Sequence, residues 1–187
     1  MHLKLTSAPR GFTLIELVIA IAVLGILLVL GIPSFTEWIH NTQVRNAAES
    51  ALNGLQIARS EAVRRNGFTQ FILGPRTGWR VITLTPPSGG GGAACQETGE
   101  IQRRDSSEGS TSANVAVTPA GVNTVTFTPL GWVGSGTNSC GNPITQLDFD
   151  SSTLTAARSR ELRLVITAGG GIRLCDPQVA AGDPRAC

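Results

Sequence analysis

Histidine is scarce in this sequence, and its two copies stand far apart. His2 lies beside the N-terminus and His40 follows a long apolar stretch. With so few histidines, the chain cannot build a Ser-His-Asp arrangement or a histidine-ligated metal site of the usual kind. The sequence therefore predicts no catalytic centre and no enzyme activity.

Metal and nucleotide motifs are also lacking. The four cysteines form no CxxC pair and have no neighbouring histidine, which disfavours a zinc site. The Gly-rich stretch 86–95, PPSGGGGAAC, lacks the Lys-Ser/Thr of a phosphate-binding loop. Asp148 and Asp150 are hard oxygen donors at alternate positions, but two carboxylates are too few to predict a calcium site. We expect no metal and no cofactor.

Lysine occurs once, at Lys4, so every later basic residue is arginine. Lys4 and Arg10 precede Phe12, and without residues 1–11 the chain keeps 13 basic and 13 acidic residues. Any binding to an anionic partner must therefore come from a local cluster of arginines.

The cysteines are better explained as disulfides. An even number of cysteines in loop-rich sequence is typical of a protein exported to an oxidising compartment. Four cysteines allow three pairings. We favour Cys175–Cys187, which closes a short tail, together with Cys95–Cys140, which joins two Gly-rich loops.

The N-terminal segment has the features of a membrane anchor. A short basic stretch, residues 1–11, precedes a run without charge from Leu17 to Ile32. Extended to Ile39, this run gives a helix of about 35 Å, enough to cross a bilayer. The residues after the run, including Pro33 and Phe35, make a poor signal-peptidase site, so we expect the apolar segment to stay on the mature protein.

An amphipathic helix follows the anchor. Six small or apolar residues recur at spacings of four and three, which predicts one narrow stripe that packs on a sheet. They are Val44, Ala48, Ala51, Leu55, Ala58 and Ala62. Asn66-Gly67 is a suitable helix end, because both residues tolerate the left-handed conformation.

The remainder reads as strands and turns. A hairpin is predicted from 68–73 and 78–85 around the loop Gly74–Gly78, and residues 105–114 form a polar loop. Further short runs rich in β-branched residues favour an antiparallel sheet. These runs are 114–118, 124–128, 131–134, 145–150, 161–167 and 170–175.

One short stretch identifies a family. Gly11-Phe12-Thr13-Leu14-Ile15-Glu16-Leu17, placed between the basic leader and the apolar run, resembles the class III signal of type IV pilin-like prepilins. The resemblance implies that a prepilin peptidase cleaves after Gly11 and methylates the new N-terminus at Phe12. It also implies that Glu16, at the fifth mature position, pairs with the N-terminal amine of a neighbouring subunit. An ion pair out of water gives register and selectivity, and an unpaired partner costs several kcal/mol.

Other segments narrow the resemblance. Residues 45–66, 77–83, 127–133 and 160–177 are similar to the FimT/FimU minor pilins and to the GspH-type pseudopilins of type II secretion, whereas residues 86–125 match neither. This implies an α+β, pilin-like fold: a long N-terminal helix on a mostly antiparallel β-sheet head. The expected parts are a leader (1–11), a membrane and filament-core helix (12–39), an amphipathic helix (40–66) and a β-rich head (67–187).

Some FimT-like proteins bind DNA through a Gly-Arg-x-Arg motif before the last strand. The matching positions are Gly170, Gly171, Ile172 and Arg173, so only Arg173 carries over. The C-terminal region also holds Arg158, Arg160 and Arg163, and such a cluster can bind phosphates in a salt-dependent way. Double-stranded DNA is therefore a secondary candidate partner.

The sequence thus predicts a structural subunit, a minor pilin of the type IV pilus tip complex that helps to prime assembly. A GspH-type pseudopilin is the alternative. The expected partners are other major and minor pilins, prepilin peptidase and the inner membrane. The head is expected in the periplasm before assembly and on the pilus, or in a periplasmic pseudopilus, afterwards.

Overall fold

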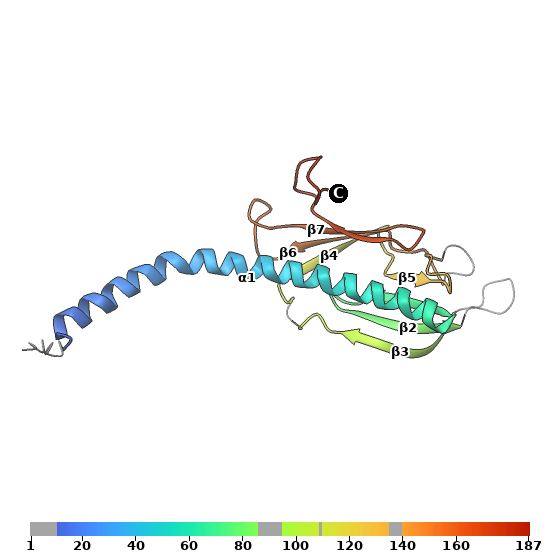
Figure 1. The fold of residues 1–187 in the computed structure, drawn as a ribbon, viewed down its shortest axis with the longest axis horizontal. Helices are drawn as coiled ribbons and strands as arrows, with labels where there is room; N and C mark the ends of the chain where they lie inside the picture. The colour runs from blue at the N-terminus through green and yellow to red at the C-terminus, as the bar shows by residue number, and fades with distance from the viewer. Residues whose placement is uncertain (1–10, 86–94, 109, 135–139) are drawn as a thin grey trace, which may run out of the picture. The chain divides into compact units, whose positions relative to one another are not determined.

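The computed structural model describes residues 11–85, 95–108, 110–134 and 140–187 (Figure 1). The chain divides into two compact units, Met1–Thr36 and Glu37–Cys187. One helix, α1 (Leu14–Arg65), contributes residues to both units. The expected leader falls on residues 1–11, of which only Gly11 is described.

The end of α1 lies where the sequence predicted it. Asn66 has a φ of 48°, the left-handed value of a helix cap, and Gly67 N donates to Ala62 O at 3.0 Å. The helix begins at Leu14, two residues after the start at Phe12 that the sequence predicts. Thr13 explains the difference, because it caps the helix instead of entering it.

The predicted stripe of α1 is fully buried. All six of its residues have no exposed surface, and Ala47 lies buried beside them. These residues form one hydrophobic core with strand residues such as Phe71, Phe127 and Leu164. The packing of this part of the helix on sheet is therefore confirmed, and small side chains line the contact.

The β-rich part contains two four-stranded sheets instead of the single sheet that the sequence suggested. Their order is β3-β2-β1-β5 and β4-β6-β7-β8, and every neighbouring pair is antiparallel. The strands are β1 (Phe68–Leu73), β2 (Trp79–Thr85), β3 (Gln96–Arg104), β4 (Ala113–Thr118), β5 (Thr124–Phe127), β6 (Gln146–Ser151), β7 (Leu162–Ile166) and β8 (Ile172–Cys175). In Figure 1, α1 passes between β2 and β3 on one side and β6 and β7 on the other.

Most predicted strands appear, with three corrections. The expected β1–β2 hairpin is present: β1 has the predicted bounds, and β2 begins at Trp79, one residue after its predicted start. Strand β3 was missed, because its charged, mostly exposed residues show no apolar alternation. Residues 131–134 form no strand but a single bridge, Phe127 to Val133, since Gly131 turns the chain. The polar loop predicted to Asn114 ends earlier, where β4 begins at Ala113.

Two side-chain amides of α1 bind loops that lead into strands of the β4-β6-β7-β8 sheet. Asn41 Nδ2 donates to Arg158 O at 3.0 Å, and Arg160 N donates to Asn41 Oδ1 at 2.9 Å, just before β7. Gln43 Oε1 accepts from Ser112 N at 2.9 Å, just before β4. Each amide satisfies loop backbone groups that no strand partner reaches.

Candidate functional site

The N-terminal motif forms a capped helix start. Glu16 N donates to Thr13 Oγ1 at 3.3 Å, and Leu17 N donates to Thr13 O at 3.2 Å. Thr13 is therefore the N-cap, and the carboxylate of Glu16 lies in the first turn, where the helix dipole favours a negative charge. The N-cap role of Thr13 was not predicted, although the Thr-x-x-Glu spacing of Thr13 and Glu16 is the signature of a capping box.

Gly11 and Phe12 precede this helix start in irregular, exposed chain. The bond between them is the expected cleavage site. Phe12 is 75% exposed, so its side chain and backbone are open to a processing enzyme.

Glu16 is the single charged residue of the described segment 11–36. The apolar side chains that follow it are at least half exposed at most positions, as at Leu17, Leu24 and Val29. Such a continuous apolar surface needs lipid or other protein chains to cover it. A carboxylate at its edge is costly unless it reaches water or a cation.

The length and hydropathy of α1 were compared with those that a membrane span needs. No single described helix qualifies as a membrane span by length and composition, while the helical stretches Leu14–Val29 and Ser34–Arg65 qualify when they are taken together. The span 12–39 stays a prediction.

The C-terminal arginines divide into two groups. Arg163 and Arg173 extend from the same face of neighbouring strands, because Arg163 pairs in register with Cys175, two residues after Arg173. Arg158 and Arg160 lie in the loop before β7, beside the part of α1 that contains Asn41.

Most of these arginines have a protein partner. Arg163 Nε lies 2.5 Å from Asp148 Oδ1, and Arg158 Nε lies 3.8 Å from Glu37 Oε2. Arg173 Nη2 donates to Cys187 O at 2.9 Å. The side chain of Arg160 is exposed. The four therefore form no continuous basic surface of unengaged side chains.

The carboxylates considered for calcium have protein partners as well. Asp148 accepts from Arg163 and from Gln146, and Asp150 Oδ1 accepts from Ser151 N at 2.6 Å. Among the residues that the structure describes, no group of three or more acidic, histidine or cysteine side chains is arranged to hold a metal ion.

Both disulfides favoured by the sequence are present. Cys95–Cys140 joins the chain before β3 to the chain before β6, and Cys175–Cys187 ties the C-terminal residue to the end of β8. The Gly-rich loop 86–95 precedes the first bridge, and only its Cys95 lies within the described residues.

A family model described as type II transport protein GspH matches residues 47–170, more than half of the chain, from the buried half of α1 through β7. The chain belongs to the GspH family. A second model, the prokaryotic N-terminal methylation motif, matches residues 7–32 and so covers Gly11, Phe12 and Glu16. Residues 86–125, which the resemblance from sequence did not cover, lie inside the GspH match.

Fimbrial proteins are among the relatives that this chain resembles in part. A fimbrial protein of Pseudomonas aeruginosa is 36% identical over a 94-residue alignment, with a coverage of 42% of this chain and 61% of that protein. The type IV major fimbrial protein FimA of Dichelobacter nodosus is 45% identical over 51 residues, 27% of this chain and 31% of that protein. This GspH-family chain thus spans less than two thirds of the fimbrial relatives it matches.

The fold is that of a solved pilin. The crystal structure of the type IV minor pilin FimU of Pseudomonas aeruginosa superposes with a TM-score of 0.50 at 20% identity, over 75% of this chain and 94% of that one. The likeness establishes the predicted α+β, pilin-like fold and nothing beyond it.

Proposed function

We propose that this GspH-family chain is a minor subunit of a type IV pilin-like filament. It is cleaved after Gly11, methylated at Phe12 and anchored in the inner membrane through residues 12–39 before assembly. The observation that carries the proposal is the position of Glu16, the one charge on an exposed apolar segment, in the first turn of a capped helix.

The apolar segment 11–36 must be covered by lipid or by other helices. In lipid, and in a bundle of like helices, Glu16 lacks water, so a neighbouring subunit must supply a cation. The free amine at Phe12, created by cleavage, is a cation at the corresponding end of the neighbouring helix. Pairing the two sets the axial register of one subunit against the next.

We further propose that the filament is a type IV pilus and that the subunit belongs to its tip and initiation complex. The fimbrial relatives favour a pilus, and the disulfides suit a head in the periplasm and then at the cell surface. The description of the matching family model favours the alternative, a pseudopilin of the type II secretion system.

The test is to delete the gene in its host and to count surface pili by electron microscopy with retraction blocked. Loss of pili, restored by the wild-type chain and not by Glu16→Ala, is the expected result. Glu16→Ala should still be processed, so its mature form accumulates in the membrane. Glu49→Ala is the matched control, because it removes an exposed carboxylate from the same helix outside the apolar segment.

Other results would revise the proposal in separate ways. Normal piliation with a loss of type II secretion would select the pseudopilin alternative. Incorporation of Glu16→Ala into sheared filaments at the wild-type level would refute the assembly role of Glu16.

Double-stranded DNA remains a secondary proposal, centred on Arg160 and Arg173. Arg160 has an exposed side chain, and Arg173 is an exposed residue of β8 that keeps one position of the DNA-binding motif. The engagement of Arg158 and Arg163 by carboxylates limits the expected affinity. Retardation of duplex DNA at low salt that Arg173→Ala weakens would support it, and no retardation would remove it.

A further inference from the structure

A rigid turn carries two large exposed apolar side chains. In the loop after β5, Thr128 N donates to Trp132 O at 2.9 Å, and Gly131 N donates to Thr128 O at 2.8 Å. Gly131 adopts a φ of 76°, which closes the turn. The tip presents Leu130, which is 70% exposed, and Trp132, which is 58% exposed.

The turn is held by contacts with the loop between β7 and β8 and with α1. Gly170, between β7 and β8, lies so close that a Cβ on it would stand 1.9 Å from Gly131 O. Arg59 Nε donates to that same oxygen at 3.1 Å. Val133 N donates to Ala168 O at 3.0 Å, which links the same two loops again. The backbone that carries Leu130 and Trp132 is therefore fixed before any partner binds, which lowers the entropic cost of binding.

A groove beside this turn is lined by residues of α1 and β8. Its lining residues are Gln56, Arg59, Ser60, Val63, Arg64 and Ile172. Val63 is exposed and, like Arg59, lies close against Gly131. Leu130 and Trp132 flank Gly131, which lies against Arg59 and Val63 of this groove. The exposed turn residues Leu130 and Trp132, the apolar groove residues Val63 and Ile172, and the neighbouring Arg59 and Arg64 are together called here the Trp132 surface.

The charge of this surface is positive. Glu61, the acidic neighbour on the helix, is shared by Arg64 and Arg65, which each approach Glu61 Oε2 to 2.6 Å. One carboxylate is thus shared by two guanidinium groups, so Glu61, Arg64 and Arg65 together carry a net charge of one positive unit.

A second copy of this chain is a poor occupant. Among the described residues of Glu37–Cys187, the exposed large hydrophobic side chains outside the Trp132 surface are limited to Trp38. Two copies that met through the Trp132 surface itself would place Arg59 and Arg64 against their own counterparts. Such like-charge contacts cost several kcal/mol in an interface.

DNA is disfavoured by the apolar centre. Protein–DNA interfaces are polar and strongly basic, whereas protein–protein interfaces combine aromatic anchors and arginines around an apolar core. Tryptophan and arginine are also the residues that most often dominate binding energy between proteins.

We propose that the Trp132 surface docks an acidic, apolar segment of a different subunit of the filament. That segment places a large apolar side chain against Trp132 and Leu130, and an adjacent Asp or Glu against Arg64. The inference rests on the proposed function, since it takes the partner to be a neighbour in the assembly.

The experiment uses the full chain in its host. Benzoyl-phenylalanine, a photoreactive residue, replaces Leu130 in one strain and Thr98, an exposed residue of β3, in a control strain. After irradiation, mass spectrometry identifies the cross-linked peptide. We expect a product from position 130 and none from position 98, and a peptide from another pilin-type subunit in which Asp or Glu adjoins a large apolar residue.

Substitutions then test the chemistry. Trp132→Ser and Arg64→Glu should each lower the yield about tenfold or more, as truncation of an interface anchor does. Arg45→Glu, the same charge change at an ion-paired arginine elsewhere on α1, should leave the yield unchanged. Replacing the partner's carboxylate with Arg should restore the yield with Arg64→Glu. If Arg64→Glu melts earlier than the wild type, Arg64→Gln takes its place with an expected drop of about threefold.

Several outcomes would overturn the docking proposal. They are a product at position 130 no stronger than at position 98, a cross-link to DNA or to another copy of this chain, a partner peptide without a carboxylate, and a yield indifferent to Arg64.

The filament fraction of the same cells separates this proposal from the proposed function. If the chain is present in filaments and position 130 gives no product, the docking surface is wrong and the function stands. If the chain is absent from filaments and yet position 130 captures an acidic, apolar segment at the membrane, the docking surface stands and the function is wrong.

Discussion

Two glutamates of α1 show how the surroundings of a carboxylate decide its role. Glu16 stands alone among exposed apolar side chains, which leaves it available to another subunit. Glu61 instead accepts hydrogen bonds from Arg64 and Arg65, and these lower its pKa to about 2. Glu61 therefore pairs with arginines of the last turn of α1, beside the Trp132 surface.

The ion pairs of Glu61 should give a defined pH dependence. Its pKa is lowered on folding, so its stabilising effect is complete above the ordinary value of 4.5 and is lost as the pH falls toward 2. We expect Glu61→Gln to lower the Tm of the detergent-solubilised chain by about 1–3 °C at pH 7. The difference from wild type, followed by circular dichroism, should shrink below pH 4.5. A difference that stays constant down to pH 2 would contradict this account.

Gly170 carries a steric requirement that no other residue meets. Its φ is 78°, and a Cβ would collide with Gly131 O. We expect Gly170→Ala to reduce the free energy of unfolding by about 2–4 kcal/mol, measured by urea denaturation. Gly169→Ala is the matched control, since an added Cβ there has no neighbour within 4 Å, and it should change stability by about 0.5 kcal/mol or less. Equal effects of the two substitutions would show that the loop contact is unimportant.

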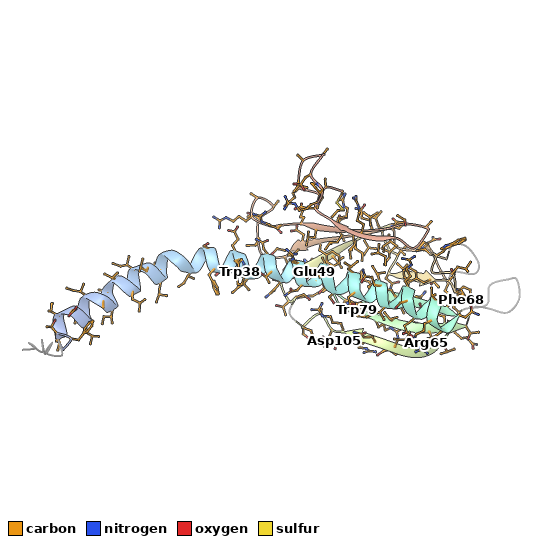
Figure 2. The ribbon with its side chains drawn as sticks, viewed as in Figure 1. Trp38, Glu49, Arg65, Phe68, Trp79 and Asp105 are labelled. Carbon is orange, nitrogen blue, oxygen red and sulfur yellow. A yellow bond between two sulfur atoms is a disulfide. The ribbon has the colours of Figure 1, made fainter. Side chains whose placement is uncertain are left out.

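At the scale of elements, the contact between α1 and the first sheet depends on small residues. Gly54 lies over Phe71 and Trp79, and Trp79 Nε1 donates to Ser50 Oγ at 2.9 Å. Figure 2 shows Trp79 beside α1, between the labelled Glu49 and Arg65. A helix that approaches a sheet this closely leaves no room for a side chain at the crossing.

Gly54→Ala should therefore destabilise the protein although alanine is the better helix former. The new Cβ would lie 2.9 Å from ring atoms of Phe71 and Trp79, so the buried rings or the helix must shift. Against a gain in helix propensity of about 1 kcal/mol, we expect a net loss of about 1–2 kcal/mol in urea denaturation. Asn53→Ala, on the exposed side of the same turn, should instead stabilise slightly. If Gly54→Ala stabilises the protein, the rings of Phe71 and Trp79 can shift away from α1 at little cost in free energy.

At the scale of the whole molecule, the disulfides constrain segments of different length. Cys95 and Cys140 are 45 residues apart, and Cys175 and Cys187 are 12 apart. Closing the longer loop removes more conformational entropy from the unfolded chain.

Removal of the two bridges should therefore have unequal effects. The double substitution Cys95→Ser with Cys140→Ser should cost about 4 kcal/mol, and Cys175→Ser with Cys187→Ser about 3 kcal/mol, in the chain-entropy description. Urea denaturation of the two variants measures the difference. The reverse order would show that native contacts around the C-terminal tail outweigh loop entropy.

Short-range chemistry allowed much of this protein to be predicted. The apolar run with one carboxylate, the buried stripe from Val44 to Ala62, the helix end at Asn66 and the β1–β2 hairpin each depend on neighbours in sequence. The cysteine pairs were favoured by loop length and position. Apart from the cysteine pairs, these features are local signals, because helix period, strand alternation and turn preference are set within a few residues.

The tertiary structure alone decided what depends on distant partners. Strand β3 is charged and exposed, and it exists because β2 offers a backbone to pair with. The division into two sheets and the engagement of Arg163 by Asp148 required the register of β6 and β7. The Trp132 surface arises from α1, from the loop after β5 and from β8, which meet through Gly131, Gly170 and Arg59. No local sequence pattern predicts these contacts, since they form only when the packed chain brings the three segments together.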